Sequence, residues 1–263
     1  MAGRATFTAV ESTATMEEAV MALIRANCLL VARTTNKPTQ RRKVVTCRRV
    51  APAQLTYRER PAAGEPEGLL ILHHGRGADE HDLLGLADVL DPGRRLHVVT
   101  PRAPLTLPGW PGHHWYVVPR VGYPDHDSFH AAFSALAALH DGLWEQTGLA
   151  PEQTVLGGFS MGTVMSYSLG LSESRPAPAG LLAFSGFVPM VDGWEPQLAD
   201  RQGTRAFIAH GRNDPIMGIE FAHRARALLE GGGLAVTYHE SGAAHHIDPA
   251  HVPAAVEWLA TTL

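Results

Sequence analysis

A serine between two glycines at positions 158–162 is the feature of this sequence best suited to chemistry. The segment reads Gly-Phe-Ser-Met-Gly and lies between an apolar strand pattern at 153–159 and a helical pattern at 161–171. A chain that passes directly from strand to helix must turn sharply, and flanking glycines leave room for the helix to return close to the strand. Such a turn exposes the Ser160 hydroxyl at a helix N-terminus, where backbone charge favours a developing anion. We therefore predict that Ser160 is a nucleophile. Because the chain contains 26 glycines, its strand and helix context supports this prediction more than the five residues do.

A serine hydroxyl needs a base, and the base needs a carboxylate that orients it. When the serine follows a strand in this way, the chain order is nucleophile, acid, base. Asp214 comes directly after a strand pattern at 204–211 and precedes Pro215, so a strand end would present its carboxylate to the site. A turn-forming aspartate is the structural alternative. Asp192, which follows another strand pattern at 181–184, is the rival acid, and we favour Asp214 because it follows the later strand.

The base is sought nearer the C-terminus, where a strand pattern at 234–238 leads into a loop of small residues and then to His245 and His246. Spacing alone does not separate two adjacent histidines. We favour His245 because it directly follows the small-residue loop, and His246 stays open as the alternative. The chain has 15 histidines, so position rather than residue type supports this prediction.

Two backbone N–H groups are candidates for holding the charge that develops on a substrate oxygen. One belongs to Met161, directly after the serine, and the other to Arg76 in the turn at 74–77, which reads His-Gly-Arg-Gly. Amides at these two places form the oxyanion hole of hydrolases with this kind of serine turn. The glycines beside Arg76 let its amide approach the oxygen closely. A plain strand-ending turn is the alternative.

Two further groups of side chains have weaker patterns. The loop at 101–124 is rich in proline, glycine and aromatic residues, and we predict that Trp115 within it borders the substrate; a packed loop aromatic is the alternative. His73, His74 and His81 could suggest a zinc site. Adjacent strand residues point to opposite faces, however, so we predict no metal.

Alternating strand and helix patterns must position these residues. They predict a mainly parallel sheet with helices on both faces, an α/β fold. The short gap between Ser160 and Asp214 leaves no room for a large cap domain. Strands are expected at 54–58, 69–72, 96–99, 153–159, 181–184, 206–209 and 234–238, and helices at 79–90, 128–148, 161–171, 219–229 and 249–263.

Charge and composition divide the chain of 263 residues into two parts. Residues 1–60 have a net charge of +7 and residues 61–263 a net charge of −11, so we predict a basic, partly disordered extension at 1–50 and one domain at 51–263. The overall charge of −4 gives no reason to expect a nucleic-acid partner. Two cysteines in so long a chain indicate a reducing compartment, with a single disulfide as the alternative, and we expect a cytoplasmic protein. No apolar run approaches the length of a membrane span.

Four separated segments together carry a resemblance to a known family. The segments at 69–83, 158–162, 210–216 and 242–249 resemble the phospholipase/carboxylesterase family of α/β-hydrolases, which includes the acyl-protein thioesterases. The string LHHGRGADE at 72–80 is especially similar to the bacterial carboxylesterases. The similarity runs from about residue 54 to the C-terminus and implies a single-domain esterase without a cofactor.

The resemblance also implies roles for individual residues. The family's nucleophile falls on Ser160, its acid on Asp214, its base on His245, and its oxyanion amides on Arg76 and Met161. Glutamine is frequent at the position of Met161, most firmly in the thioesterases, so its absence favours simple esters over lipidated proteins. The family's histidine usually follows glycine, whereas an alanine precedes His245 here.

The sequence thus predicts a serine carboxylesterase that hydrolyses small to medium carboxylic esters through an acyl-enzyme, with the ester as its small-molecule partner. A thioesterase, lysophospholipase or peptidase on the same fold is the first alternative. A non-catalytic binding protein of this fold is the second.

Overall fold

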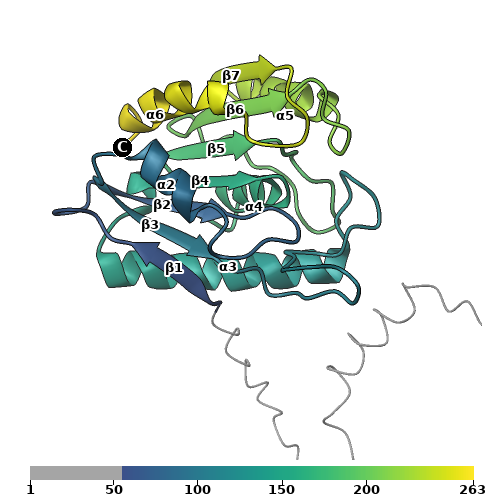
Figure 1. Ribbon diagram of the computed structural model, residues 1–263, viewed down its shortest axis with the longest axis horizontal. Coiled ribbons are helices and arrows are strands. Elements are labelled where there is room, and N and C mark those ends of the chain that lie inside the picture. Colours follow the sequence, from purple (N-terminus) through teal and green to yellow (C-terminus); the bar gives the residue numbers. More distant parts are fainter. Residues whose placement is uncertain (1–54) are drawn as a thin grey trace, which may run out of the picture. The chain divides into compact units, whose positions relative to one another are not determined.

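The computed structural model describes residues 55–263 (Figure 1). The extension predicted at 1–50 lies outside the described residues, and its boundary stays a prediction. Within residues 55–263, seven strands form one sheet in the order β1-β3-β2-β4-β5-β6-β7. Of the strand pairs in this described sheet, β1 with β3 is antiparallel and the others are parallel. The strands are β1 (Tyr57–Arg60), β2 (Gly68–His73), β3 (Leu96–Pro101), β4 (Thr154–Phe159), β5 (Gly180–Phe184), β6 (Arg205–Gly211) and β7 (Ala235–Ser241).

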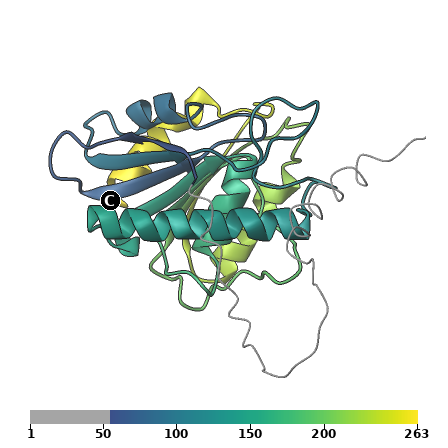
Figure 2. The ribbon, with the colours of Figure 1, turned by 90° about the horizontal axis from the view of Figure 1, so that it is seen from below.

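Five α-helices within residues 55–263 cover both faces of the sheet. They are α2 (Leu84–Leu90), α3 (His126–Thr147), α4 (Met161–Gly170), α5 (Glu220–Gly231) and α6 (Val252–Ala260), with short 3-10 turns at Pro151–Gln153 and Pro249–His251. In Figure 2 the blue α2 and the yellow α6 lie on one side of the strands and the long α3 lies on the other. None of these helices is long and apolar enough to cross a lipid bilayer.

Strand β2 shows how the sequence builds two cores around one sheet. Its side chains alternate between the faces, as the strand period requires. Leu69 and Ile71 join the core beneath α3, α4 and α5, whereas Leu70 and Leu72 join the core beneath α2 and α6. A strand buried on both faces appears as the continuous apolar run seen in the sequence.

The ends of α3 follow from its capping residues. Asp125 accepts a hydrogen bond from the Ser128 backbone N–H, which satisfies one of the free donors at the helix start. Gly148 ends the helix in the left-handed conformation, with φ of 70°. The sequence placed the end correctly and the start two residues late.

The helix predicted at 79–90 is shorter in the structure, and this is a correction. Residues before α2 form turns instead of helix, and α2 begins at Leu84. Asp79 accepts a hydrogen bond from the backbone N–H of His81, an interaction that competes with helix formation. The last predicted helix is also divided, because Asp248 caps a 3-10 turn that precedes α6.

The arrangement is an α/β-hydrolase fold, with a mostly parallel sheet between two helical layers. Between Ser160 and Asp214 the chain forms only α4, β5, β6 and their connecting loops. No cap domain is inserted there, as the sequence predicts.

Candidate active site

Ser160 occupies a strained turn between β4 and α4. Its backbone has φ of 56° and ψ of −119°, a conformation that residues with a side chain rarely adopt. The two neighbouring glycines are sterically required. A Cβ on Gly162 would lie 1.9 Å from the carbonyl oxygen of His73, and a Cβ on Gly158 would lie 2.6 Å from the carbonyl carbon of Gly162. The glycines therefore allow the close approach that the sequence predicted.

Hydrogen bonds from the next strand hold this turn in place. The Ser160 backbone N–H donates to the Phe184 carbonyl at 2.9 Å. The Thr163 hydroxyl lies 2.6 Å from the Gly158 carbonyl and 2.7 Å from the Phe184 carbonyl, so it links both strands to the first turn of α4. Strain persists only where surrounding structure fixes it, and these contacts supply that constraint.

The structure brings together the predicted nucleophile, acid and base from three separate loops. The Ser160 Oγ lies 2.8 Å from His245 Nε2, and His245 Nδ1 lies 2.6 Å from Asp214 Oδ2. Asp214 follows β6 and His245 follows β7, so both reach the serine from the carboxyl ends of adjacent parallel strands. The catalytic role of these side chains stays a prediction, but their geometry is that of a nucleophile, its base and an orienting carboxylate.

The rival residues do not join this chain of hydrogen bonds. Among residues 55–263, His246 makes only a backbone hydrogen bond, from its N–H to the Ala244 carbonyl. Asp192 contributes its backbone carbonyl to a 2.8 Å contact with His130 Nε2 and does not contact His245. The geometry therefore favours His245 and Asp214 over both alternatives.

The carboxylate of Asp214 is fixed by backbone donors as well as by the histidine. Its Oδ1 accepts hydrogen bonds from the N–H groups of Ile216 and Met217, both at 2.8 Å. Burial alone would raise the pKa of this carboxyl, but the bonds from His245 and the two amides together hold the pKa below its ordinary value. An ionised Asp214 accepts, so His245 Nδ1 carries the proton and Nε2 accepts from the serine hydroxyl.

His210 is a neighbour of the acid that the sequence reasoning missed. Its side chain is fully buried, and its Nε2 lies 2.8 Å from the Met217 carbonyl and 3.5 Å from Asp214 Oδ2. Burial lowers the pKa of His210, which favours a neutral ring beside the carboxylate. The available signal was a polar residue inside the apolar run of β6, four residues before the acid.

The two predicted oxyanion donors have no hydrogen-bond partner among residues 55–263. Neither the Arg76 nor the Met161 backbone N–H donates a hydrogen bond to another group in the described part of the chain. The turn around Arg76 is fastened beyond it, because Gly77 N–H donates to the His113 carbonyl and His113 N–H donates to the Ala78 carbonyl, both at 2.9 Å. These contacts hold the turn and leave the Arg76 amide available.

The prediction that Trp115 borders the substrate is wrong for the structure as it stands. The side chain is 0% exposed, so it does not face a space that a ligand could enter. Its Nε1 donates to the His74 carbonyl at 2.9 Å, and its backbone N–H donates to the Met161 sulfur at 3.3 Å. Trp115 therefore links the turn at 74–77 to the residue after the serine, which is the packed alternative that the sequence left open.

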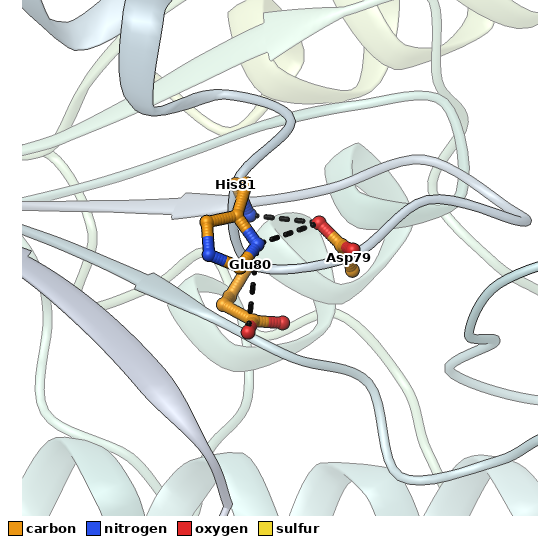
Figure 3. Close-up of side chains that lie close together, drawn as sticks. All are labelled: Asp79, Glu80 and His81. Carbon is orange, nitrogen blue, oxygen red and sulfur yellow. Dashed lines mark hydrogen bonds and ion pairs between the residues drawn. The ribbon is translucent and has the colours of Figure 1, made fainter.

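The three histidines considered for zinc do not converge. His81 lies with Asp79 and Glu80, and Figure 3 shows these three side chains pointing toward one another. His73 Nδ1 instead contacts the Ser166 hydroxyl, and the ring nitrogens of His74 contact backbone groups.

Glu80, one of the three residues drawn in Figure 3, is also paired with the cation of Arg102, which the figure does not draw. Both oxygens of Glu80 accept hydrogen bonds from the Arg102 guanidinium, each at 2.5 Å. These bonds lower the pKa of Glu80 to about 2. Arg58 Nε donates to His81 Nε2 at 3.1 Å, which occupies one of the two histidine nitrogens. The side chains of this cluster thus belong to an ion-pair network that directly follows the turn at 74–77 in the chain.

Comparison with known proteins identifies the family to which this geometry belongs. The model of the phospholipase/carboxylesterase family matches residues 60–263. The chain belongs to this family. The match begins after the predicted extension and includes every site residue discussed above.

Relatives of the chain include both esterases and thioesterases. An acyl-protein thioesterase 1 from Gibberella zeae is 28% identical over 205 residues, covering 68% of this chain and 83% of that protein. A putative hydrolase, MhqD, from Bacillus subtilis is 27% identical over 196 residues, covering 74% of this chain and 94% of that protein. The crystal structure of a Bacillus cereus carboxylesterase matches with a TM-score of 0.70 and 26% identity, over 80% of this chain and 96% of that one. The protein is therefore a hydrolase of the esterase or thioesterase type.

Proposed function

We propose that this protein is a serine carboxylesterase that hydrolyses small to medium carboxylic esters through an acyl-enzyme. The observation that carries the proposal is the continuous hydrogen-bond chain from Ser160 through His245 to Asp214. A neutral imidazole whose Nδ1–H donates to a buried carboxylate can accept a proton at Nε2.

In the first half of the reaction, the Ser160 hydroxyl attacks the ester carbonyl and its proton passes to His245 Nε2. The carbonyl oxygen becomes negative and accepts hydrogen bonds from the Arg76 and Met161 amides, each worth on the order of 3 kcal/mol of barrier. The imidazolium is stabilised by Asp214, which remains ionised. His245 then gives its proton to the departing alcohol, and the acyl group stays on Ser160.

In the second half, a water molecule takes the place of the alcohol. His245 removes a proton from the water, which attacks the acyl carbonyl and forms the same negatively charged oxygen in the same hole. His245 then returns the proton to the Ser160 oxygen as the carboxylic acid leaves. The enzyme ends in its starting protonation state, so no cofactor is needed to balance the reaction.

The open carboxyl edge of the sheet supports esters of modest size as substrates. The loop after β6 presents an exposed apolar side chain beside the proposed site, that of Ile216, whose backbone N–H donates to Asp214. Ile216 is only two residues from Asp214, so an apolar acyl or alcohol group has a surface to contact beside the catalytic acid. Without a cap domain, such a surface encloses a small substrate only partly.

The residue after the nucleophile supports simple esters over thioesters of lipidated proteins. In place of the polar glutamine frequent in thioesterases, Met161 turns its sulfur toward the backbone N–H of Trp115. Its buried side chain thus offers the substrate no strong hydrogen-bond donor. Thioesterase action remains the second candidate, because relatives such as the Gibberella zeae protein bear that name.

Labelling with a fluorophosphonate probe tests the proposal. We expect the wild-type protein to be labelled and Ser160→Ala not to be labelled, with both shown to be folded by circular dichroism. A folded wild-type protein that is not labelled would support a binding protein without catalysis. A panel of short and long acyl esters and thioesters then decides the substrate. A clear optimum at long-chain thioesters would overturn the preference for simple esters.

A further inference from the structure

The proposed oxyanion turn carries an exposed cation that has no acidic partner within residues 55–263. No carboxylate oxygen there lies within 4.0 Å of the Arg76 guanidinium, and the side chain is exposed. Seven other arginines of residues 55–263 are paired with acids at that distance, and five are not: Arg94, Arg120, Arg201, Arg205 and Arg224. Arg76 differs from these five in its place in the turn at 74–77. This unneutralised charge belongs to the residue whose backbone amide is proposed to bind the ester oxygen.

An aromatic ring holds the guanidinium of Arg76 in position. Its Cζ lies 4.0 Å from the centre of the Trp110 ring, and Trp110 itself is 46% exposed. Stacking on an aromatic face orients the planar guanidinium without using any of its N–H groups. The five donors in the guanidinium plane therefore stay available for a planar anion such as a carboxylate.

The Trp110 side chain is itself placed by the backbone beside the oxyanion turn. Trp110 N–H donates to the Leu107 carbonyl at 3.0 Å, which closes a tight turn. Two residues later, Gly112 approaches so closely that a Cβ there would lie 2.0 Å from the Gly77 carbonyl oxygen. The stack is thus set by contacts between two loops next to the proposed site, where a substrate group could meet it.

We propose that Arg76 and Trp110 form a subsite for a carboxylate on the substrate. The enzyme then prefers esters whose acyl chain ends in a carboxylate, such as monoesters of dicarboxylic acids, over neutral esters of the same length. The inference rests on the proposed function, because the acyl carbonyl must be bound at the Arg76 amide for its chain to lie near the Arg76 side chain. The same acyl group is transferred to Ser160 in the first half of the reaction and released from it in the second, so the same contact serves both halves.

A matched pair of chromogenic esters tests this subsite. The pair is the 4-nitrophenyl monoester of glutaric acid and the same compound with its free carboxylate capped as a methyl ester. The measured quantity is the ratio of kcat/KM for the charged ester to kcat/KM for the capped ester. Each variant supplies its own reference, so a general loss of activity cancels in the ratio.

In the wild-type enzyme we expect this ratio to exceed one and to fall as salt is added, since salt screens exposed charges. In Arg76→Gln the ratio falls about tenfold, because the backbone amide stays while the charge-assisted hydrogen bonds are lost. Arg76→Glu lowers it further, and Trp110→Leu lowers it less because the cation remains but loses its support. Arg95→Gln is the control for lost charge, because Arg95 pairs with Glu67 at the opposite end of the strands, and it keeps the wild-type ratio.

Two results would overturn the subsite. One is a wild-type ratio at or below one, and the other is an equal ratio in the wild type and Arg76→Gln. Either result, with hydrolysis of the capped ester that depends on Ser160, leaves the proposed esterase function standing. Hydrolysis of neither ester, together with no fluorophosphonate labelling, removes the esterase function and the subsite with it.

Discussion

Two buried carboxylates lie near the same edge of the sheet, and they have opposite kinds of partner. The side chains of Glu80 and Asp214 are both 0% exposed. Glu80 is matched by the permanently charged guanidinium of Arg102, whereas Asp214 is matched by the imidazole of His245 and two backbone amides. The first pair is already neutral overall. The pair of Asp214 and neutral His245 keeps a net negative charge, which stabilises the imidazolium that forms when His245 accepts a proton.

Because their partners differ, the buried carboxylates of Glu80 and Asp214 are expected to contribute to different properties, the first to stability and the second to catalysis. A carboxylate that is neutralised by a permanent cation helps to hold its loop in place. It does not stabilise a positive charge that develops on another group during a reaction. A carboxylate held by neutral donors stabilises a positive charge at the moment it appears. We therefore expect substitution of Asp214 to affect rate most and substitution of Glu80 to affect stability most.

Of the substitutions at these two carboxylates, Asp214→Asn is expected to have the largest effect on rate. The amide keeps the size of the carboxylate but cannot accept the Nδ1 proton with a full negative charge, so the tautomer of His245 and the stability of its imidazolium are both lost. We expect kcat to fall by about four orders of magnitude, as in other serine hydrolases of this design. Steady-state kinetics with 4-nitrophenyl butanoate measures it. A loss of less than tenfold in a folded variant would contradict the role of Asp214.

Glu80→Gln should show the opposite behaviour. Removing the charge leaves the partly exposed Arg102 guanidinium with a neutral, weaker acceptor, which we expect to lower the free energy of unfolding by about 1 kcal/mol. Urea unfolding followed by circular dichroism measures this loss. Activity per folded molecule should change much less than in Asp214→Asn. Unchanged stability would show that Glu80 does not hold the turn.

The buried histidines and the buried carboxylates are expected to affect stability in different pH ranges. Burial lowers the pKa of His73 to about 3 and of His74 to about 4. On acidification below about pH 6.5, these two histidines bind protons in the unfolded chain but remain neutral in the folded one. The free energy of unfolding is therefore highest above about pH 6.5 and falls as the pH is lowered toward pH 4. Each histidine adds up to about 1.4 kcal/mol per pH unit to this slope. Urea midpoints measured between about pH 7 and about pH 3 test it.

The Glu80→Gln variant shows which part of this pH dependence comes from the carboxylate, since the pKa of Glu80 is lowered to about 2. A carboxyl with a lowered pKa stabilises the fold above its unfolded pKa and loses that contribution as pH falls toward its folded pKa. The variant should therefore keep the wild-type slope between pH 6.5 and pH 5 and have a shallower slope below about pH 4.5. A changed slope above pH 5 would contradict the assignment of that window to histidines.

The smallest expected effects belong to the rival residues. His246→Ala and Asp192→Asn should each change kcat/KM by less than about threefold, because neither side chain joins the hydrogen-bond chain and surface substitutions typically cost little. Hydrolysis of the same ester measures both. A loss of a hundredfold in either variant would reverse the choice of base or acid made from the geometry.

Much of the site could be predicted because strand topology determines where loop residues meet. Ser160, Asp214 and His245 follow β4, β6 and β7, and the carboxyl ends of parallel strands share one edge of a sheet. The choice of His245 over His246 depended on a single residue step, so only the structure could show which ring faces the serine.

The incorrect predictions came from contacts that sequence patterns do not show. A tryptophan in a loop can either line a binding pocket or pack inside the protein. Trp115 packs inside, where its Nε1 donates a hydrogen bond to the His74 carbonyl. The early start predicted for α2 failed because Asp79 bonds its own local backbone and Glu80 bonds the distant Arg102. His210 was missed because an isolated histidine within an apolar strand acquires meaning only from its neighbour, Asp214.

The most direct test of the central claim is the activity of Ser160→Ala on 4-nitrophenyl butanoate, with folding verified by circular dichroism. If Ser160 is the nucleophile, kcat/KM falls by at least about three orders of magnitude, because the hydroxyl that forms the acyl-enzyme is gone. A folded Ser160→Ala protein whose kcat/KM stays within tenfold of the wild type would contradict the account.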